Sequence, residues 1–127
     1  KNFILISPKQ LEMPAEIITK IKKNGGKIRE SESLIDNIEN LDVIYDTRVQ
    51  KERFADAGEY EKLKFAYVID KKVMLKAKKT AVLMHPLPRV GEIATEVDSD
   101  PRALYLREQM RNGMYIRMAL LDLILNK

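Results

Sequence analysis

Residues 81–89 read Ala-Val-Leu-Met-His-Pro-Leu-Pro-Arg, so two prolines follow closely on four apolar residues. The apolar run predicts a strand at residues 81–84 that lies inside a parallel sheet. Proline fixes its own φ, lacks an N–H group and restricts the residue before it. Pro86 and Pro88 therefore end the strand and predict a stiff turn at its carboxyl end.

The rest of the chain alternates short apolar runs with amphipathic stretches, which is the pattern of βαβ units. We expect an α/β fold with a three-layer, doubly wound, mainly parallel sheet of the Rossmann-like kind. The first expected strand, residues 3–6, should be buried on both faces, and the second, residues 27–30, should form a sheet edge. Further strands are expected at residues 43–45 and 65–69. The expected helices are residues 14–23, 34–41, 59–64, 71–79 and 112–126.

Length and composition exclude several classes of protein. A chain of 127 residues corresponds to one domain. The absence of cysteine excludes a disulfide framework and a thiolate metal site, and one histidine leaves little room for a multi-histidine centre. We therefore expect no metal and no cofactor. The net charge of +4 is too small to indicate a nucleic-acid partner.

The amino-terminal residues and the apolar runs bear on location. No apolar run approaches the ~20 residues of a membrane span, and residues 1–10 do not resemble a secretory signal. We expect a cytoplasmic location and no membrane partner. An apolar strand begins at residue 2 or 3 with nothing before it, which suggests that the sequence is a piece of a longer protein.

Ligands of open α/β sheets bind outside the carboxyl ends of the strands, where two polar segments of this chain are expected. In the first, residues 47–53, Arg48 offers a planar fork of donors that suits a carboxylate, and Gln50 adds amide groups. Glu52 lies four residues after Arg48 and could hold the guanidinium. The segment therefore fits a carboxylate site, although its composition alone favours the charged first turn of a surface helix.

The second polar segment is the turn after the strand at residues 81–84. The two prolines leave the carbonyls of Pro86 and Leu87 without backbone partners, so these oxygens could accept hydrogen bonds from an amino or amide group. The prolines also suit a simple strand stop, and His85 also suits a hydrogen-bonded core residue. Both interpretations stay open on the residues alone.

The last expected helix, residues 112–126, is apolar on most of its circumference. Arg117 and Asp122 are its only charged residues before the end. We expect one side to cover the sheet of this domain and the other to meet a second domain or subunit. A membrane surface is the alternative, but the polar face lacks the expected lysines and arginines.

Taken together, these segments resemble the aspartate carbamoyltransferases. The segments that carry the resemblance are Thr-Arg-Val-Gln-Lys-Glu-Arg at residues 47–53, His-Pro-Leu-Pro-Arg-Val at 85–90, Glu-Ile at 92–93, Val-Asp at 97–98 and the helix at 112–121. The resemblance spans the chain but covers only the carboxyl-terminal half of such an enzyme. It implies that residues 1–127 are the aspartate-binding domain, the second domain of the aspartate/ornithine carbamoyltransferase fold.

The resemblance implies an activity and a set of substrate-binding residues. The family transfers the carbamoyl group of carbamoyl phosphate to L-aspartate, which gives N-carbamoyl-L-aspartate and phosphate in de novo pyrimidine biosynthesis. Arg48 and Gln50 would bind the aspartate carboxylates. The carbonyls of Pro86 and Leu87 would accept from the carbamoyl nitrogen and the attacking amine, and Pro88 would hold the turn. No residue of this chain would act as an acid, base or nucleophile.

The resemblance also implies supporting residues. Glu52 would orient Arg48, and Lys51 and Arg53 would belong to a loop that moves on domain closure. The other residues expected behind the substrate or in the adjoining loop are His85, Arg89 and Glu92.

Other parts of such an enzyme lie outside this sequence. The phosphate-binding Ser-Thr-Arg-Thr segment of the family lies in an amino-terminal carbamoyl-phosphate domain, and a neighbouring subunit of a homotrimer completes the site. A further aspartate-binding arginine would lie just before Lys1. We therefore expect this chain alone to be inactive, and the intact enzyme to be a trimer with or without regulatory chains or fused domains. The alternatives are an ornithine carbamoyltransferase-like domain and a non-catalytic binding module of the same fold.

Overall fold

The computed structural model describes residues 1–54 and 56–126, with the backbone alone for Arg53 and Ala57. Its strands are β1 (Asn2–Ile6), β2 (Lys27–Ser31), β3 (Val43–Tyr45) and β4 (Val82–Met84). Its α-helices are α1 (Ala15–Lys23), α2 (Ala57–Leu63), α3 (Lys71–Lys76) and α4 (Glu108–Leu125). Each lies in or next to a segment where the sequence predicts the same type of element.

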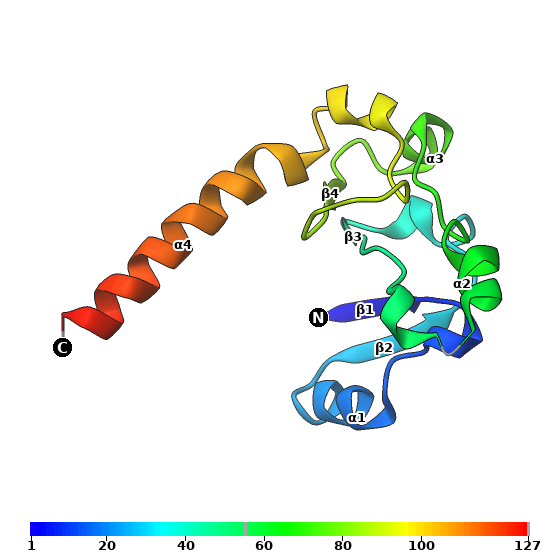
Figure 1. Cartoon of the computed structure of the whole chain (residues 1–127), viewed down its shortest axis with the longest axis horizontal. Coiled ribbons are helices and arrows are strands. Elements are labelled where there is room, and N and C mark those ends of the chain that lie inside the picture. Colours follow the sequence, from blue (N-terminus) through cyan, green and yellow to red (C-terminus); the bar gives the residue numbers. More distant parts are fainter. Residues whose placement is uncertain (55, 127) are drawn as a thin grey trace.

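The strands pair in parallel, as the alternation of strands and helices predicts (Figure 1). β1 pairs with β2, with Asn2 opposite Lys27, and α1 is the crossover between them. β3 pairs with β4, with Val43 opposite Val82 and Tyr45 opposite Met84. Because both pairs are parallel, the chain leaves the strands of each pair at a common carboxyl edge.

The hydrophobic core surrounds β3 and β4. Leu83 of β4 has no exposed surface, and the apolar side chains packed with it come from β3, α3 and the segments around them. The buried apolar residues are Ile38, Ile44, Ile69, Val73, Met74, Ala77, Ala81, Leu83, Ile93, Val97, Ala103 and Tyr105. None of these lies in β1, β2 or α1. β1 is exposed or half-buried along its length, so the expectation that it is buried on both faces is wrong here.

Local signals set the ends of α1. Pro14 occupies the position before the first helical residue, where its missing N–H costs nothing. Gly25 has φ +76 and its N–H donates to the carbonyl of Lys22, so a left-handed glycine ends the helix as the sequence predicts.

The helix expected at residues 34–41 is absent, and a 3₁₀ turn at Ile38–Asn40 takes its place. Local side-chain hydrogen bonds compete with the helix. Asn37 is buried and its amide group donates to Ser31 Oγ (2.9 Å) and to the Ser33 carbonyl (2.6 Å). Ser33 Oγ accepts from the Asp36 N–H. Such bonds offer the backbone a turn in place of a helix.

The strand expected at residues 65–69 is also absent. Only Ile69 forms a bridge, with Ile93, through the Ile69 N–H to the Glu92 carbonyl (2.8 Å) and the Ala94 N–H to the Ile69 carbonyl (3.0 Å). The residues before it leave α2 in a turn, in which the Ala66 N–H donates to the Leu63 carbonyl. Apolar character alone did not distinguish a strand from a covering loop.

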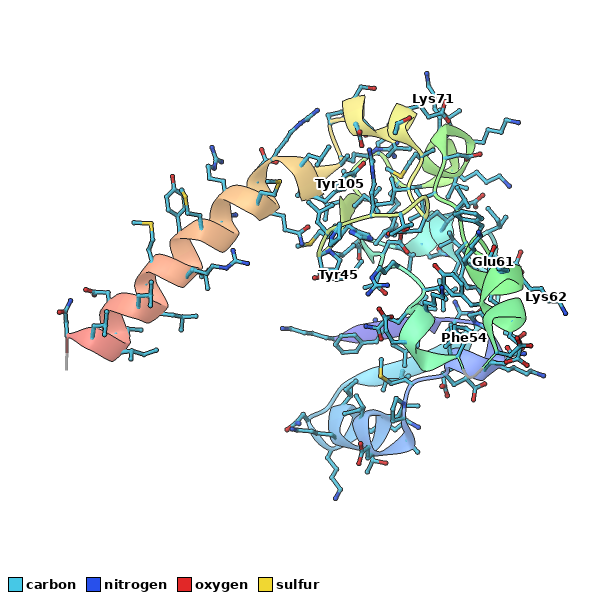
Figure 2. All side chains as sticks on the ribbon, viewed as in Figure 1. Tyr45, Phe54, Glu61, Lys62, Lys71 and Tyr105 are labelled. Atoms are coloured by element: carbon cyan, nitrogen blue, oxygen red, sulfur yellow. The ribbon has the colours of Figure 1, made fainter. Side chains whose placement is uncertain are left out.

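The closing helix is longer than expected and lies elsewhere. α4 begins at Glu108 rather than near residue 112. The helix α3 also differs from its expected bounds, because it ends at Lys76 and not at residue 79. α4 extends away from the rest of the chain as a straight rod (Figure 1) and has no buried residue. The expectation that one of its sides covers the sheet is therefore wrong. Its side chains stand clear of the rest of the chain along most of its length (Figure 2).

The central position of Leu83 predicts a large cost of truncation. Replacing Leu83 with Ala should lower the free energy of unfolding by about 3 kcal/mol, because apolar contacts are lost and a cavity remains. Leu75→Ala on α3 is the matched control, since Leu75 is 76% exposed, and it should cost under about 0.5 kcal/mol. Urea unfolding followed by circular dichroism measures both, and equal losses would contradict this description of the core.

Candidate functional site

A cleft of about 740 Å³ lies at the carboxyl ends of β1, β3 and β4. Since Tyr45 and Met84 are paired at the ends of two parallel strands, the next residues, Asp46 and His85, leave the sheet side by side. The Asp46 N–H continues the ladder with a hydrogen bond to the Met84 carbonyl (3.0 Å). The cleft is lined by residues 4–8, 11–14, 45–50, 64, 67, 85–88 and 92. Both polar segments singled out in the sequence therefore reach the same cleft.

Arg48 and Gln50 enter the cleft from an irregular segment after β3. The Arg48 guanidinium donates to both carboxylate oxygens of Glu52, at 3.1 and 3.5 Å. The pKa of Glu52 is lowered, first by its own backbone N–H and then by Arg48. Both side chains reach solvent, so the pair adds little stability. Its effect is to orient the guanidinium fork.

The rest of this segment forms a 3₁₀ turn at Lys51–Arg53 and does not begin an α-helix. The Lys51 ammonium lies 6.0 Å from the centre of the Tyr60 ring of α2, outside the cleft lining. The side chain of Arg53 lies outside the described part of the structure. The roles of Lys51 and Arg53 in a mobile loop stay predictions.

The turn after β4 is held by side chains behind it. The Leu87 N–H donates to His85 Nδ1 (2.9 Å), and the Val90 N–H donates to Glu92 Oε2 (2.9 Å). Leu87 has φ +54, an uncommon conformation for a residue with a side chain. Among the hydrogen bonds of the described residues, none is accepted by the carbonyls of Pro86 or Leu87. These two oxygens remain available to a ligand, as the proline pattern suggests.

Arg89, which follows the turn, belongs to a closed polar network. Its guanidinium donates to both carboxylate oxygens of Asp98, and the Tyr105 hydroxyl donates to Asp98 Oδ1 (2.5 Å). Hydrogen bonding from Arg89 lowers the pKa of Asp98, while burial and Asp98 raise the pKa of Tyr105 to about 12. Arg89 does not line the cleft, so it anchors the outgoing end of the turn.

Asp46 lines the cleft but was not predicted as a site residue. Its Oδ2 atom is buried and has no hydrogen-bond partner. Burial, and then the charge of Glu92, raises the pKa of Asp46 to about 7, although a hydrogen bond from the Thr47 backbone partly opposes this rise. Its position directly after a predicted strand was the only signal in the sequence.

The described residues contain neither a metal-binding cluster nor a membrane-spanning helix. No group of three or more histidine, cysteine, aspartate or glutamate side chains in residues 1–54 and 56–126 could hold a metal ion. None of the helices in these ranges is long and apolar enough to cross a membrane.

A second cleft, of about 690 Å³, lies over β1 and β3 and is lined mainly by apolar residues.

Comparison with known proteins places this chain in a family. The sequence model for the Asp/Orn-binding domain of aspartate/ornithine carbamoyltransferase matches residues 1–124. The chain belongs to this family. The aspartate carbamoyltransferase catalytic subunit of Alkaliphilus oremlandii is similar to this chain, with 48% identity over 125 residues, which are 98% of this chain and 38% of the relative.

Solved structures place the chain in the same family. The catalytic subunit of M. jannaschii aspartate transcarbamoylase is 43% identical with a TM-score of 0.84, over 99% of this chain and 40% of that chain. Aspartate transcarbamoylase of Trypanosoma cruzi in complex with N-(phosphonacetyl)-L-aspartic acid is 42% identical with a TM-score of 0.82, over 95% and 39% of the two chains. The predicted fold class is confirmed. The chain spans about two fifths of the length of these relatives.

The buried carboxyl of Asp46 predicts a dependence of stability on pH. The unfolded chain ionises Asp46 above 3.8, whereas the folded chain keeps the proton until about pH 7. The folded state binds more protons in this window, so stability falls as pH rises from 3.8 to about 7 and then levels off. Asp46→Asn should therefore raise the free energy of unfolding at pH 8 by on the order of 2 kcal/mol and change it little below pH 4. Thermal unfolding across this pH range measures the difference, which should not be constant.

Proposed function

We propose that this chain is the L-aspartate-binding half of an enzyme that transfers the carbamoyl group of carbamoyl phosphate to L-aspartate. The products are N-carbamoyl-L-aspartate and phosphate, in de novo pyrimidine biosynthesis. One observation carries the proposal: Arg48 and Gln50 line the same cleft as the unpaired carbonyls of Pro86 and Leu87. An amino dicarboxylate needs cationic and amide donors for its carboxylates and oxygen acceptors for its amine.

The main task of the protein in this reaction is to position the two substrates. The lone pair of the aspartate amine attacks the carbamoyl carbon, the bond from that carbon to the phosphate oxygen breaks, phosphate leaves with the electron pair, and the nitrogen loses a proton. Arg48, held by Glu52, binds a carboxylate and fixes the amino acid. The carbonyls of Pro86 and Leu87 orient the amine and the carbamoyl nitrogen, and Pro88 keeps the turn rigid.

The carbamoyl-phosphate half of the reaction belongs to an amino-terminal domain that this chain does not include. The ligand of the Trypanosoma cruzi structure combines a phosphono group with aspartate, which supports a site at which both substrates meet. In the intact enzyme we place this domain in a cytoplasmic homotrimer, with a neighbouring subunit completing the site.

The apolar surface of α4 supports a missing partner domain. Leu123, Ile124 and Leu125 are 65%, 68% and 74% exposed, although such side chains are normally buried. The relatives are more than twice as long as the matched region, so the amino-terminal domain is the partner that we assign to this helix.

Ornithine is the competing amino-acid substrate. The family description covers both aspartate and ornithine, whereas the three relatives named above are aspartate enzymes. Arg48 and Gln50 together suit the second carboxylate that aspartate has and ornithine lacks. The corresponding strand end of ornithine carbamoyltransferases resembles His-Cys-Leu-Pro, and Pro86 stands at the position of that cysteine. The complete set of substrate-facing groups argues against a non-catalytic module of the same fold.

The isolated chain should fold, bind L-aspartate weakly or not at all, and show no turnover, because much of the site lies outside it. Isothermal titration calorimetry with L-aspartate and with succinate measures this affinity. A submicromolar dissociation constant would contradict the assignment of half a site to this chain.

Arg48→Ala should weaken aspartate use once the amino-terminal domain is supplied. Loss of paired charge-assisted hydrogen bonds should raise the KM for aspartate by roughly 100-fold, with a smaller loss in kcat from poorer positioning. Lys22→Ala removes an exposed positive charge on α1 and serves as the control. An unchanged aspartate dependence in Arg48→Ala would show that Arg48 does not bind the substrate.

A further inference from the structure

Three residues that line the cleft each have a buried side-chain atom without a hydrogen-bond partner. Among the described residues these atoms are Asp46 Oδ2, His85 Nε2, Glu92 Oε1 and, elsewhere, Glu108 Oε2. His85 Nε2 and Glu92 Oε1 lie 2.7 Å apart but lack hydrogen-bond alignment. Glu92 is also near enough for its charge to act on Asp46. Buried unpaired groups are costly, so this Asp46–His85–Glu92 cluster needs an explanation.

The hydrogen bond from the Leu87 N–H fixes the tautomer of His85. Since Nδ1 accepts that bond at 2.9 Å, the ring proton lies on Nε2, which faces Glu92 Oε1. If both carboxyl groups were ionised, two negative charges would share this single N–H donor. A proton on Asp46 Oδ2 supplies a second donor, and both donors can then point at Glu92 Oε1, which has two lone pairs. One proton satisfies all three atoms.

We propose that Asp46 is a positioning residue that carries this proton and donates it to Glu92, which keeps His85 and the turn bearing the Pro86 and Leu87 carbonyls in place. The groups are linked in order: the charge of Glu92 acts on Asp46, Glu92 Oε1 lies 2.7 Å from His85 Nε2, Glu92 accepts from the Val90 N–H, and His85 Nδ1 accepts from the Leu87 N–H. Removing the proton sets a second negative charge against Glu92 and loosens this chain.

The surroundings favour Asp46 as the member that takes the proton. Burial and Glu92 raise its pKa to about 7, which leaves it largely protonated in mildly acidic solution. The other ionisable side chains lining the same cleft are Glu12 from the segment before α1, Tyr45 of β3, Arg48, Lys64 after α2, and Tyr67. Of these, Arg48 is paired with Glu52 and Lys64 with Glu61. Among the described charges, Glu92 is the one that raises the pKa of Asp46.

The single histidine of the chain makes the cluster directly observable. In the ¹⁵N-labelled 127-residue protein, the His85 ring nitrogens and the Leu87 amide should shift together with a midpoint near pH 7, while Nδ1 remains unprotonated. Asp46→Asn keeps a donor and cannot ionise, so this step should vanish and both signals should resemble those of the wild type in acid. Asp36→Asn removes an exposed carboxyl and should keep the step.

Each outcome of this titration decides the proposal. A step with the same midpoint in Asp46→Asn would assign it to His85 or Glu92 and overturn the proposal, as would the absence of a step in the wild type. Protonation of Nδ1 during the step would also overturn it. A dispersed amide spectrum for each variant establishes that the protein is folded.

A second readout links the proton to binding and rests on the proposed function. With the amino-terminal domain supplied, the KM for aspartate should rise roughly tenfold between about pH 6 and about pH 8.5 and should stay nearly flat in Asp46→Asn. The same rise in both proteins would overturn the positioning role. A complete lack of carbamoyl transfer in the wild type would instead overturn the proposed function and leave the NMR result standing.

Discussion

The parallel pairing of β3 with β4 is the constraint on which the core and the cleft both depend. β4 is hydrogen-bonded on two sides, through the Val82 N–H to the Asp42 carbonyl (3.0 Å) and the Leu83 N–H to the Arg102 carbonyl (2.8 Å). Leu83 is therefore the centre of the buried apolar cluster. The same register brings Asp46 and His85 out of the sheet together, so the packing that stabilises the domain also places the two polar segments in one cleft.

Two polar networks flank the turn, and they differ in completeness. The Arg89–Asp98–Tyr105 network pairs each charge with a hydrogen-bonding partner, so it can fix the outgoing end of the turn at little cost. The Asp46–His85–Glu92 cluster has two carboxyl groups and one imidazole, so its hydrogen bonds depend on how many protons it holds. The first network is suited to holding the turn rigid, and the second is suited to changing its hydrogen bonds when it gains or loses a proton.

Hydrophobic patterns predicted the strands that became β1 to β4, because each is an apolar or alternating run between strong turn residues. They failed at residues 34–41, where Asn37 and Ser33 form side-chain hydrogen bonds that replace the helix. The Arg48–Glu52 pair and the turn after β4 could be predicted because an arginine four residues before a glutamate and two prolines after a strand each restrict the local structure. Asp46 could not, because a single aspartate after a strand is ordinary and its environment comes from Glu92, which is distant in the sequence.

The composition of α4 predicted a missing partner but not the direction in which the helix leaves the domain. A helix that packs on a sheet buries its apolar face there, whereas α4 keeps apolar side chains exposed along its length. It contacts the rest of the chain near Leu104–Leu106. Most helical stability in proteins comes from tertiary packing, so the stability of α4 depends on whatever covers it. The cleft, by contrast, is built on β3 and β4 and does not use α4 beyond the bond from the His85 N–H to Gln109. The cleft and the exposed apolar surface of α4 are thus physically separate, and the hydrogen bond from the His85 N–H to Gln109 links them.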